Sequence, residues 1–296
     1  IYRQMSIHEE YQYLSLIENI LKNGCDFDSR NGSTKSIFGN MMRFSLNDGI
    51  IPILTTKKVA WKTCFKELQW FIKGHTDNKL LKEVNVHIWD DNGSKEFLEK
   101  QNLTYREDDL GPVYGHQWRH FNAPYTDCNA DYTNQGIDQL QELINNLKSE
   151  EGRKSRRLII SAWNPCQIKE MALPPCHVLM QFYVSENKYL SCSLYQRSGD
   201  VGLGVPFNIA SYSFLTHMLA KHCGLEAKDF VYFLGNAHIY EEHIKPLKEQ
   251  IQREPLPFPK ITFKEVKENI EDYSLTDIEF SQEYKFHKQI KMEMKA

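Results

Sequence analysis

Apolar residues recur at every third or fourth position in the segments 8–23 and 61–73, which is the spacing of one face of an α-helix. Helices are also expected over residues 135–149, 206–222 and 239–253. The segment 206–222 is long and mostly apolar. These segments predict a chain with helices along its whole length.

Other segments alternate apolar and polar residues, which predicts β-strands. Leu190, Cys192 and Leu194 fall on one face of such a segment, and the polar residues between them fall on the other. Helices and strands are mixed without regular β-α-β order, so we predict one α/β (α+β) domain over residues 1–296, built on a large mixed sheet with flanking helices. Further strands are expected over residues 37–46, 158–163, 178–185, 229–236, 260–266 and 276–280. The loop 28–34 is rich in turn-forming residues, and residues 90–135 are expected to be irregular.

Composition narrows the class of protein. The 296 residues are 41% hydrophobic and 25% charged with a net charge of −3, which argues against a general nucleic-acid-binding surface. No apolar stretch reaches the roughly 18 residues that span a bilayer, and no signal-peptide pattern opens the chain. Seven scattered cysteines without a C-x-x-C pair favour a reducing, cytoplasmic setting and no metal site.

The run Pro174-Pro175-Cys176-His177 contains the strongest candidate nucleophile. A cysteine reacts as its thiolate, so a neighbouring positive charge matters. A hairpin between this run and the polar segment 195–200 would bring Arg197 beside Cys176. The alternative is that Cys176, like the other six cysteines, is a small buried hydrophobic residue.

Several charged residues have two interpretations. Arg156 and Arg157, just before a predicted strand, suit bidentate binding of phosphate, but such a pair is more often a solvated basic patch. Arg30, in a small glycine-containing loop, has the same two interpretations. Glu67 lies close to the apolar face of its helix, so its carboxylate is paired, exposed at an edge, or has a raised pKa suited to proton transfer.

Three polar residues suit a nucleoside. His238 and Tyr240 lie on one face at the end of a strand, where they bind a sugar hydroxyl or merely cap the sheet. Asn208 opens an apolar helix, where it is an N-cap or an amide that reads a pyrimidine edge by donating and accepting hydrogen bonds.

The order and spacing of seven sequence blocks resemble thymidylate synthase over roughly residues 8–296. The blocks are residues 36–39 (SIFG), 110–115 (LGPVYG), 162–165 (AWNP), 172–177 (ALPPCH), 196–208, 238–240 (HIY) and 290–294 (IKMEM). The resemblance implies reductive methylation of dUMP to dTMP, with 5,10-methylenetetrahydrofolate as donor of both carbon and hydride and without a metal.

The resemblance also implies roles for individual residues. Cys176 would add to C6 of uracil, Arg197 would lower the pKa of its thiol and bind phosphate, Glu67 would transfer protons through water, and Tyr114 would assist loss of the C5 proton. The implied dUMP contacts are Arg30, Arg156, Arg157, Gln196, Arg197, Ser198, Asp200, Asn208, His238 and Tyr240. The implied folate contacts are Trp89, Asn92, Asp200, Leu203, Gly204, Phe207 and Ala296.

At the level of assembly, the resemblance implies a homodimer with sheets packed back to back and with Arg156 and Arg157 reaching into the partner's site. The tail at residues 290–296 would close over both ligands. Residues 1–7 form a lead-in, and the start at Ile1 suggests a piece of a longer chain, such as the synthase part of a bifunctional dihydrofolate reductase–thymidylate synthase. The loop at Arg30 is one residue shorter than usual in the family, and the tail lacks the usual Asn-Pro-His-Pro.

Three other functions remain as alternatives. A pyrimidine hydroxymethylase on the same fold would carry Asp rather than Asn208 to suit cytosine. A cysteine hydrolase would need an oriented imidazole base, and His177, as the immediate neighbour of Cys176, would point away from it. RNA binding is known in the family, but the acidic net charge offers no dedicated surface for it.

Overall fold

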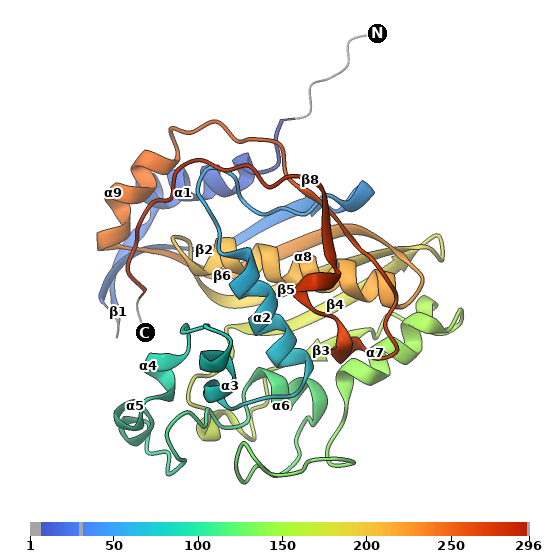
Figure 1. Cartoon of the computed structure of the whole chain (residues 1–296). Coiled ribbons are helices and arrows are strands. Elements are labelled where there is room, and N and C mark those ends of the chain that lie inside the picture. The colour runs from blue at the N-terminus through green and yellow to red at the C-terminus, as the bar shows by residue number, and fades with distance from the viewer. Residues whose placement is uncertain (1–6, 30–31, 295–296) are drawn as a thin grey trace.

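A six-stranded sheet forms the centre of residues 7–29 and 32–294, the part of the chain that this computed structural model describes (Figure 1). The strand order is β1-β2-β6-β5-β4-β3, with β5 and β6 parallel and the other neighbours antiparallel. The predicted mixed sheet is therefore confirmed. The strands are β1 Cys25–Ser29, β2 Gly32–Ser45, β3 Ile159–Ser161, β4 His177–Ser185, β5 Tyr189–Asp200 and β6 Glu226–Tyr240, with β7 Lys260–Phe263 and β8 Ile278–Gln282 in a separate pair.

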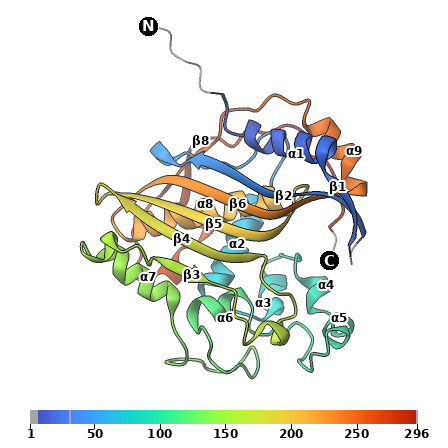
Figure 2. The same ribbon diagram turned by 180° about the vertical axis from the view of Figure 1, so that it is seen from behind.

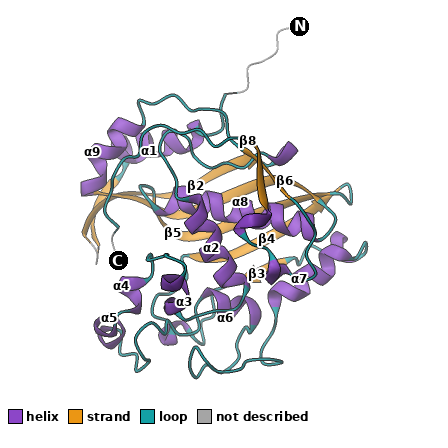
Figure 3. Cartoon of the chain, viewed as in Figure 1, coloured by secondary structure: helices purple, strands orange, loops and turns teal. Residues whose placement is uncertain are grey.

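Helices flank the sheet, as expected. The lower part of the molecule, between α3 and α7, consists largely of loops and short helices (Figure 3). None of the helices in the described ranges is long and apolar enough to cross a membrane. The helices are α1 Tyr11–Asn23, α2 Trp61–Ile72, α3 Asn78–Glu83, α4 Asp90–Gly93, α5 Lys95–Lys100, α6 Tyr114–Arg119, α7 Gln139–Lys148, α8 Gly204–His222 and α9 Glu241–Gln250.

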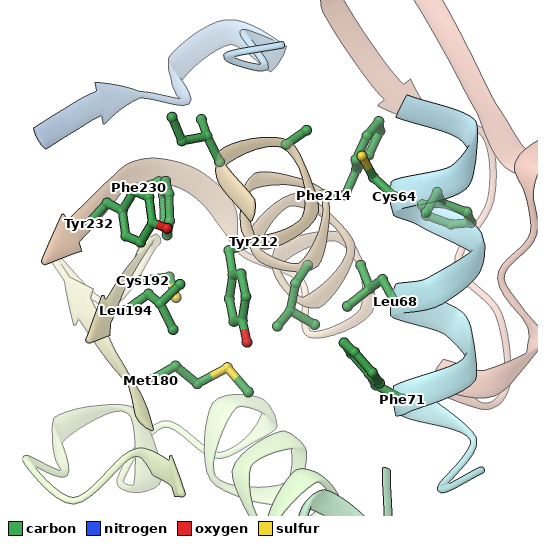
Figure 4. Close-up of a cluster of buried hydrophobic side chains, with 14 of the residues drawn as sticks. Cys64, Leu68, Phe71, Met180, Cys192, Leu194, Tyr212, Phe214, Phe230 and Tyr232 are labelled. Atoms are coloured by element: carbon green, nitrogen blue, oxygen red, sulfur yellow. The ribbon is translucent and has the colours of Figure 1, made fainter. Parts of the chain in front are cut away.

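Helix α8 is buried on almost all sides because its sequence is apolar all round. It packs against β5 and β6 on one side and against α2 on the other. In Figure 4, Tyr212 of α8 points toward Cys192 and Leu194 of the sheet, and Phe214 points toward Cys64 of α2. One hydrophobic core therefore joins the sheet, α8 and α2, and it fixes how the site residues on these elements lie relative to one another.

Some element boundaries differ from the predictions. Helix α8 begins at Gly204 with Leu203 as its N-cap, so Asn208 lies in the second turn and its interpretation as an N-cap is wrong. The early start is possible because Pro206 falls in the first turn, where a missing N–H costs no hydrogen bond. Residues 25–29 form β1, paired with the start of β2, where only a loop was expected from residue 28 onward. The segment 90–135, expected to be irregular, contains the short helices α4 to α6.

The face of the sheet opposite α8 carries exposed apolar side chains. Seen from behind, β6, β5 and β4 lie in front of α8 and no helix crosses them (Figure 2). Met41, Phe233 and Tyr195 are direct neighbours in the register of β2, β6 and β5, and they are 52%, 42% and 39% exposed. A row of large apolar side chains in contact with water is typical of a surface that another protein covers.

Candidate active site

Cys176 lies immediately before β4, where its backbone is held from two sides. Its N–H donates to the Tyr114 hydroxyl oxygen over 2.8 Å, and its carbonyl accepts from the Arg197 N–H over 2.9 Å. The side chain is partly exposed. Since a reactive thiol must be both fixed and reachable, this placement suits a nucleophile better than a core residue.

Arg197 lies beside Cys176, as predicted, because β4 and β5 pair with His177 opposite Gln196. Its guanidinium donates through Nε to the Pro175 carbonyl and through Nη2 to the Pro174 carbonyl, each over 2.8 Å. The guanidinium has five N–H groups, so others remain available for an anionic ligand.

The electrostatics of the thiol differ in part from the expectation. Burial raises the pKa of Cys176, and the positive charge of Arg197 lowers it but only partly offsets the burial. The expected effect of Arg197 is therefore present, but burial is the larger effect and the net pKa lies above the ordinary value. The thiol therefore needs a proton acceptor, or a further positive charge, when it reacts.

Glu67 lies on α2 with only 6% of its surface exposed. Its Oε1 accepts a hydrogen bond from Trp89 Nε1 over 2.7 Å. Burial raises the pKa of its carboxyl group to about 7, although the Trp89 hydrogen bond acts in the opposite direction. Of the three interpretations of this residue, the raised pKa is confirmed, and a carboxyl group that titrates near neutrality is able both to donate and to accept a proton.

Tyr114 contacts both the Cys176 backbone and the ring of Trp89. Its hydroxyl oxygen accepts from the N–H groups of Cys176 and His177, over 2.8 and 3.3 Å, so its hydrogen is not used by these bonds. Its ring lies 6.2 Å from that of Trp89. Burial raises its pKa further above the ordinary value, and the hydroxyl stays neutral. The structure thus brings Cys176, Tyr114, Trp89 and Glu67 together from four segments of the chain.

His177 is a buried neighbour of this cluster that the sequence analysis did not assign to the site. Its ring packs against Tyr114 and Tyr212, with centroids 5.1 and 5.2 Å apart. Burial lowers its pKa to about 4, while the neighbouring Asn208 amide acts in the opposite direction. A base this weak removes a thiol proton poorly at neutral pH, which argues against a cysteine hydrolase.

The end of β6 presents the two residues expected at a sugar. The rings of His238 and Tyr240 are nearly perpendicular, with centroids 5.3 Å apart. His238 Nδ1 lies 2.9 Å from Asn236 Oδ1, an acceptor, so Nδ1 carries the hydrogen and Nε2 is left as an acceptor when the ring is neutral. Asp200, at the end of β5, is the register neighbour of His238. The predicted placement of both side chains on one strand face is confirmed.

The residues expected at the folate lie on two elements. Trp89 and Asn92 are buried at α4, and the amide nitrogen of Asn92 has no hydrogen-bond partner among the described residues. An orphaned buried donor of this kind suits a polar ligand. Leu203, Gly204 and Phe207 are half-buried around the start of α8.

Other predicted residues lie apart from this cluster or are engaged elsewhere. Arg156 and Arg157 are exposed and line a surface hollow of about 690 Å³ together with Lys154. Gln196 is buried: its Oε1 accepts from the Tyr232 hydroxyl over 2.5 Å, and its Nε2 donates to the Ser198 carbonyl over 2.8 Å.

Arg30 and Ala296 lie outside the described residues, as do residues 1–6. Within the described ranges, no group of three or more His, Cys, Asp or Glu side chains is arranged to hold a metal ion.

A mixed sheet that carries a partly exposed cysteine beside a guanidinium, with a buried carboxyl group of raised pKa in the same region, is typical of the class of proteins that use a cysteine nucleophile. Within that class the chain belongs to the thymidylate synthase family, whose sequence profile matches residues 11–296.

Individual relatives agree with this assignment. The chain is 53% identical to thymidylate synthase of Homo sapiens, covering 97% of this chain and 91% of that protein. It is 51% identical to thymidylate synthase of equine herpesvirus 2, covering 98% and 99%. It is also 51% identical to the bifunctional dihydrofolate reductase–thymidylate synthase of Zea mays, covering 97% of this chain and 54% of that protein. The chain thus spans about half the length of the bifunctional relatives that it matches.

Proposed function

We propose that this chain catalyses the reductive methylation of dUMP to dTMP, with 5,10-methylenetetrahydrofolate as co-substrate and dihydrofolate as second product. The observation that carries the proposal is a partly exposed Cys176 whose backbone N–H donates to Tyr114, with the Tyr114 ring packed near Trp89 and Trp89 hydrogen-bonded to a Glu67 carboxyl group with a pKa of about 7. A nucleophilic thiol and an acid that exchanges a proton near neutral pH are the two groups needed to add to a pyrimidine ring and to protonate the anion that forms.

The first step is addition of the Cys176 thiolate to C6 of uracil. Negative charge then develops at C5 and at the O4 oxygen, and the protonated carboxyl group of Glu67 supplies a proton toward O4 through water. We assign the Asn208 amide, buried in the second turn of α8, to the O4 and N3 edge of uracil. An amide can donate to O4 and accept from the N3–H group.

The folate supplies the one-carbon unit and the hydride. For binding the folate, the chain supplies the buried Trp89 side chain and the Asn92 amide nitrogen, which has no hydrogen-bond partner among the described residues. These groups fit a flat ring with polar substituents. In the proposed reaction the Tyr114 hydroxyl assists loss of the C5 proton, and His238 with Tyr240 holds the ribose 3′-hydroxyl. The tail 290–296 excludes water while the methylated product forms.

The phosphate is bound by Arg197, Ser198 and Arg30 of one subunit and by Arg156 and Arg157 of its partner. The exposed row Met41, Phe233 and Tyr195 supports a homodimer formed through this face of the sheet. On this proposal the hollow at Arg156 faces the other subunit. A second copy would cover the apolar side chains and supply the missing charge.

We propose further that residues 1–296 form one synthase domain in the cytoplasm, with residues 1–7 as lead-in. RNA binding is not part of the proposal. The close alternative is a hydroxymethylase acting on dCMP, which the buried Asn208 amide disfavours, because a carboxylate suits the cytosine amino group better.

Two assays test the function. With dUMP and methylenetetrahydrofolate, we expect dihydrofolate to form in step with dTMP; turnover of dCMP without dihydrofolate would overturn the assignment. With 5-fluoro-dUMP and methylenetetrahydrofolate, we expect a stable covalent ternary adduct, since fluorine does not leave as a proton does. The Cys176→Ala variant serves as the negative control, and an adduct that persists in this variant would remove Cys176 from the mechanism.

A further inference from the structure

His243 is a fully buried histidine in the first turn of α9, between β5 and the tail. Its Nε2 lies 2.8 Å from the backbone carbonyl of Glu293. Its Nδ1 lies 3.5 Å from Oδ1 of Asp200. One ring thus contacts both a residue expected at the folate and the segment expected to close over it.

The Glu293 carbonyl decides the tautomer of this ring. A carbonyl only accepts, so Nε2 must carry the hydrogen. In the neutral ring Nδ1 would then present its lone pair to the Asp200 carboxylate, and two acceptors would face each other. Only the imidazolium, which is protonated on both nitrogens, makes both contacts attractive. Among the described residues Nδ1 has no hydrogen-bond partner, and its interaction with Asp200 at 3.5 Å is an ion-pair contact.

The space around the ring is built for this approach. A Cβ atom on Gly202 would lie 2.6 Å from His243 Nδ1, 3.1 Å from Asp200 Oδ1 and 3.2 Å from Met292 Sδ. Glycine at this position is what lets the two side chains and the tail converge. Upstream, Arg253 Nη1 donates to the Lys288 carbonyl over 2.6 Å, so the tail is held before it reaches His243.

Other charged or titratable groups near the ring either favour or disfavour its positive charge. Lys57, whose Nζ donates to the Gly202 carbonyl, and His238 on β6 disfavour a second positive charge. Tyr240 packs its ring 5.6 Å away. Glu241 and Glu242 share the first turn of α9. Burial lowers the pKa of His243, but Asp200 and the Glu293 carbonyl outweigh it, and the net pKa lies above the ordinary value.

We propose that His243 is a positioning residue that ties the tail at residues 290–294 to Asp200, so that the folate-binding carboxylate and the closing segment are set together by one cationic side chain. This inference rests on the proposed function, because the expected folate contact of Asp200 comes from it. The link exists while the ring is protonated. It is lost as the pH rises through the raised pKa of His243.

Two substitutions separate the two contacts, because the side-chain amides of Gln and Asn place their nitrogen at different numbers of bonds from the backbone. The amide nitrogen of His243→Gln corresponds to Nε2 and keeps a donor for Glu293, whereas that of His243→Asn corresponds to Nδ1 and keeps a donor for Asp200. His217→Gln is the matched control, since His217 on α8 also donates from a ring nitrogen to a backbone carbonyl, that of Ile50, over 2.8 Å.

We expect His243→Gln to leave amide hydrogen exchange at residues 290–294 as in the wild type but to raise the KM for methylenetetrahydrofolate about tenfold, because one ion-pair contact of Asp200 is lost. The KM for dUMP should change far less, and the alkaline rise in folate KM of the wild type should disappear. His243→Asn should speed tail exchange, and His217→Gln should change neither property. Equal losses in both His243 variants, with the pH profile of the wild type retained, would overturn the proposal.

The ligand-free wild type offers a test that needs neither turnover nor a variant. A ¹H–¹⁵N titration of the histidine rings should show His243 protonated at Nε2 throughout and titrating at Nδ1 above the ordinary histidine pKa. A neutral ring that carries its hydrogen on Nδ1 would contradict the proposed link even if the enzyme makes dTMP. Conversely, the expected titration in a protein that does not turn over dUMP would leave the link intact and refute the proposed function.

Discussion

The surroundings of Cys176 and the surroundings of Arg156 differ in how complete they are. Around Cys176, four segments of one chain supply a nucleophile, a cation, a hydroxyl group and a buried acid. Hydrogen bonds of 2.8 Å hold Tyr114 and Arg197 against the backbone at Pro175 and Cys176, and one of 2.7 Å joins the acid to Trp89. Around Arg156, exposed cations line an open hollow, and the nearby sheet face exposes apolar side chains. Burial tunes the pKa values of the first region, whereas the second has the charge and apolar surface that a partner would complete.

The largest effect is expected from removing the nucleophile in the Cys176 region. Cys176→Ser should lower kcat by at least about 10⁴-fold, because a hydroxyl group ionises far less readily than a thiol and the covalent step depends on the anion. Dihydrofolate formation measures the loss. Cys166→Ser, at an exposed cysteine, is the matched control and should leave kcat unchanged. Substantial turnover by Cys176→Ser would contradict covalent catalysis at this position.

The next largest effect is expected from placing charge on the exposed apolar face of the sheet near Arg156. Tyr195→Asp combined with Phe233→Asp should convert a dimer into monomers, because charge would have to be buried in an apolar interface. Activity should fall on the order of 10³-fold through loss of both partner arginines. Sedimentation velocity and the dUMP assay measure the two changes. Val266→Asp, at another exposed apolar residue, should have no effect, and a double variant that stays fully active as a monomer would refute the dimer proposal.

A smaller effect sharpens the first region. Glu67→Gln should lower kcat about 10²-fold, because the amide cannot relay a proton. The limb of the wild-type pH profile near pH 7 should disappear with it. Glu18→Gln on the exposed face of α1 is the control. A profile that keeps its limb in Glu67→Gln would assign that limb to another group.

The same residue gives a stability test with a definite sign. The folded carboxyl group has a pKa raised from 4.5 to about 7, so the folded state holds its proton longer than the unfolded state. Stability therefore falls as the pH rises through this window, by roughly 3 kcal/mol. Urea unfolding at several pH values should show this fall for the wild type relative to Glu67→Gln. An equal slope in both proteins would contradict the burial of a titrating carboxyl group.

The smallest effect sharpens the second region. Arg156→Ala should raise the KM for dUMP about tenfold, in keeping with loss of one charge-assisted hydrogen bond to phosphate. Deoxyuridine, which has no phosphate, should be used equally poorly by the wild type and the variant. Lys154→Ala, in the same hollow, is the control. An unchanged KM for dUMP would return Arg156 to the interpretation of a solvated basic patch.

Much of the architecture follows from local sequence alone. The alternation of Leu190, Cys192 and Leu194 predicted β5 and its buried face, and the apolar segment from residue 206 predicted α8. Boundaries were less predictable. Asn208 looked like an N-cap until the structure placed the start of α8 at Gly204, because a first turn without an obvious capping side chain leaves little local signal.

The sequence by itself determined which residue types the chemistry has available: a cysteine after two prolines, a glutamate close to an apolar stripe, and an arginine one hairpin away. The tertiary structure alone decided the pKa values of these side chains and which other side chains they contact. Burial, which raises the pKa of both Cys176 and Glu67, depends on segments far apart in the chain. The convergence of His243, Asp200 and Glu293 depends on it too, since their contacts join positions more than 40 residues apart, beyond the reach of any local pattern.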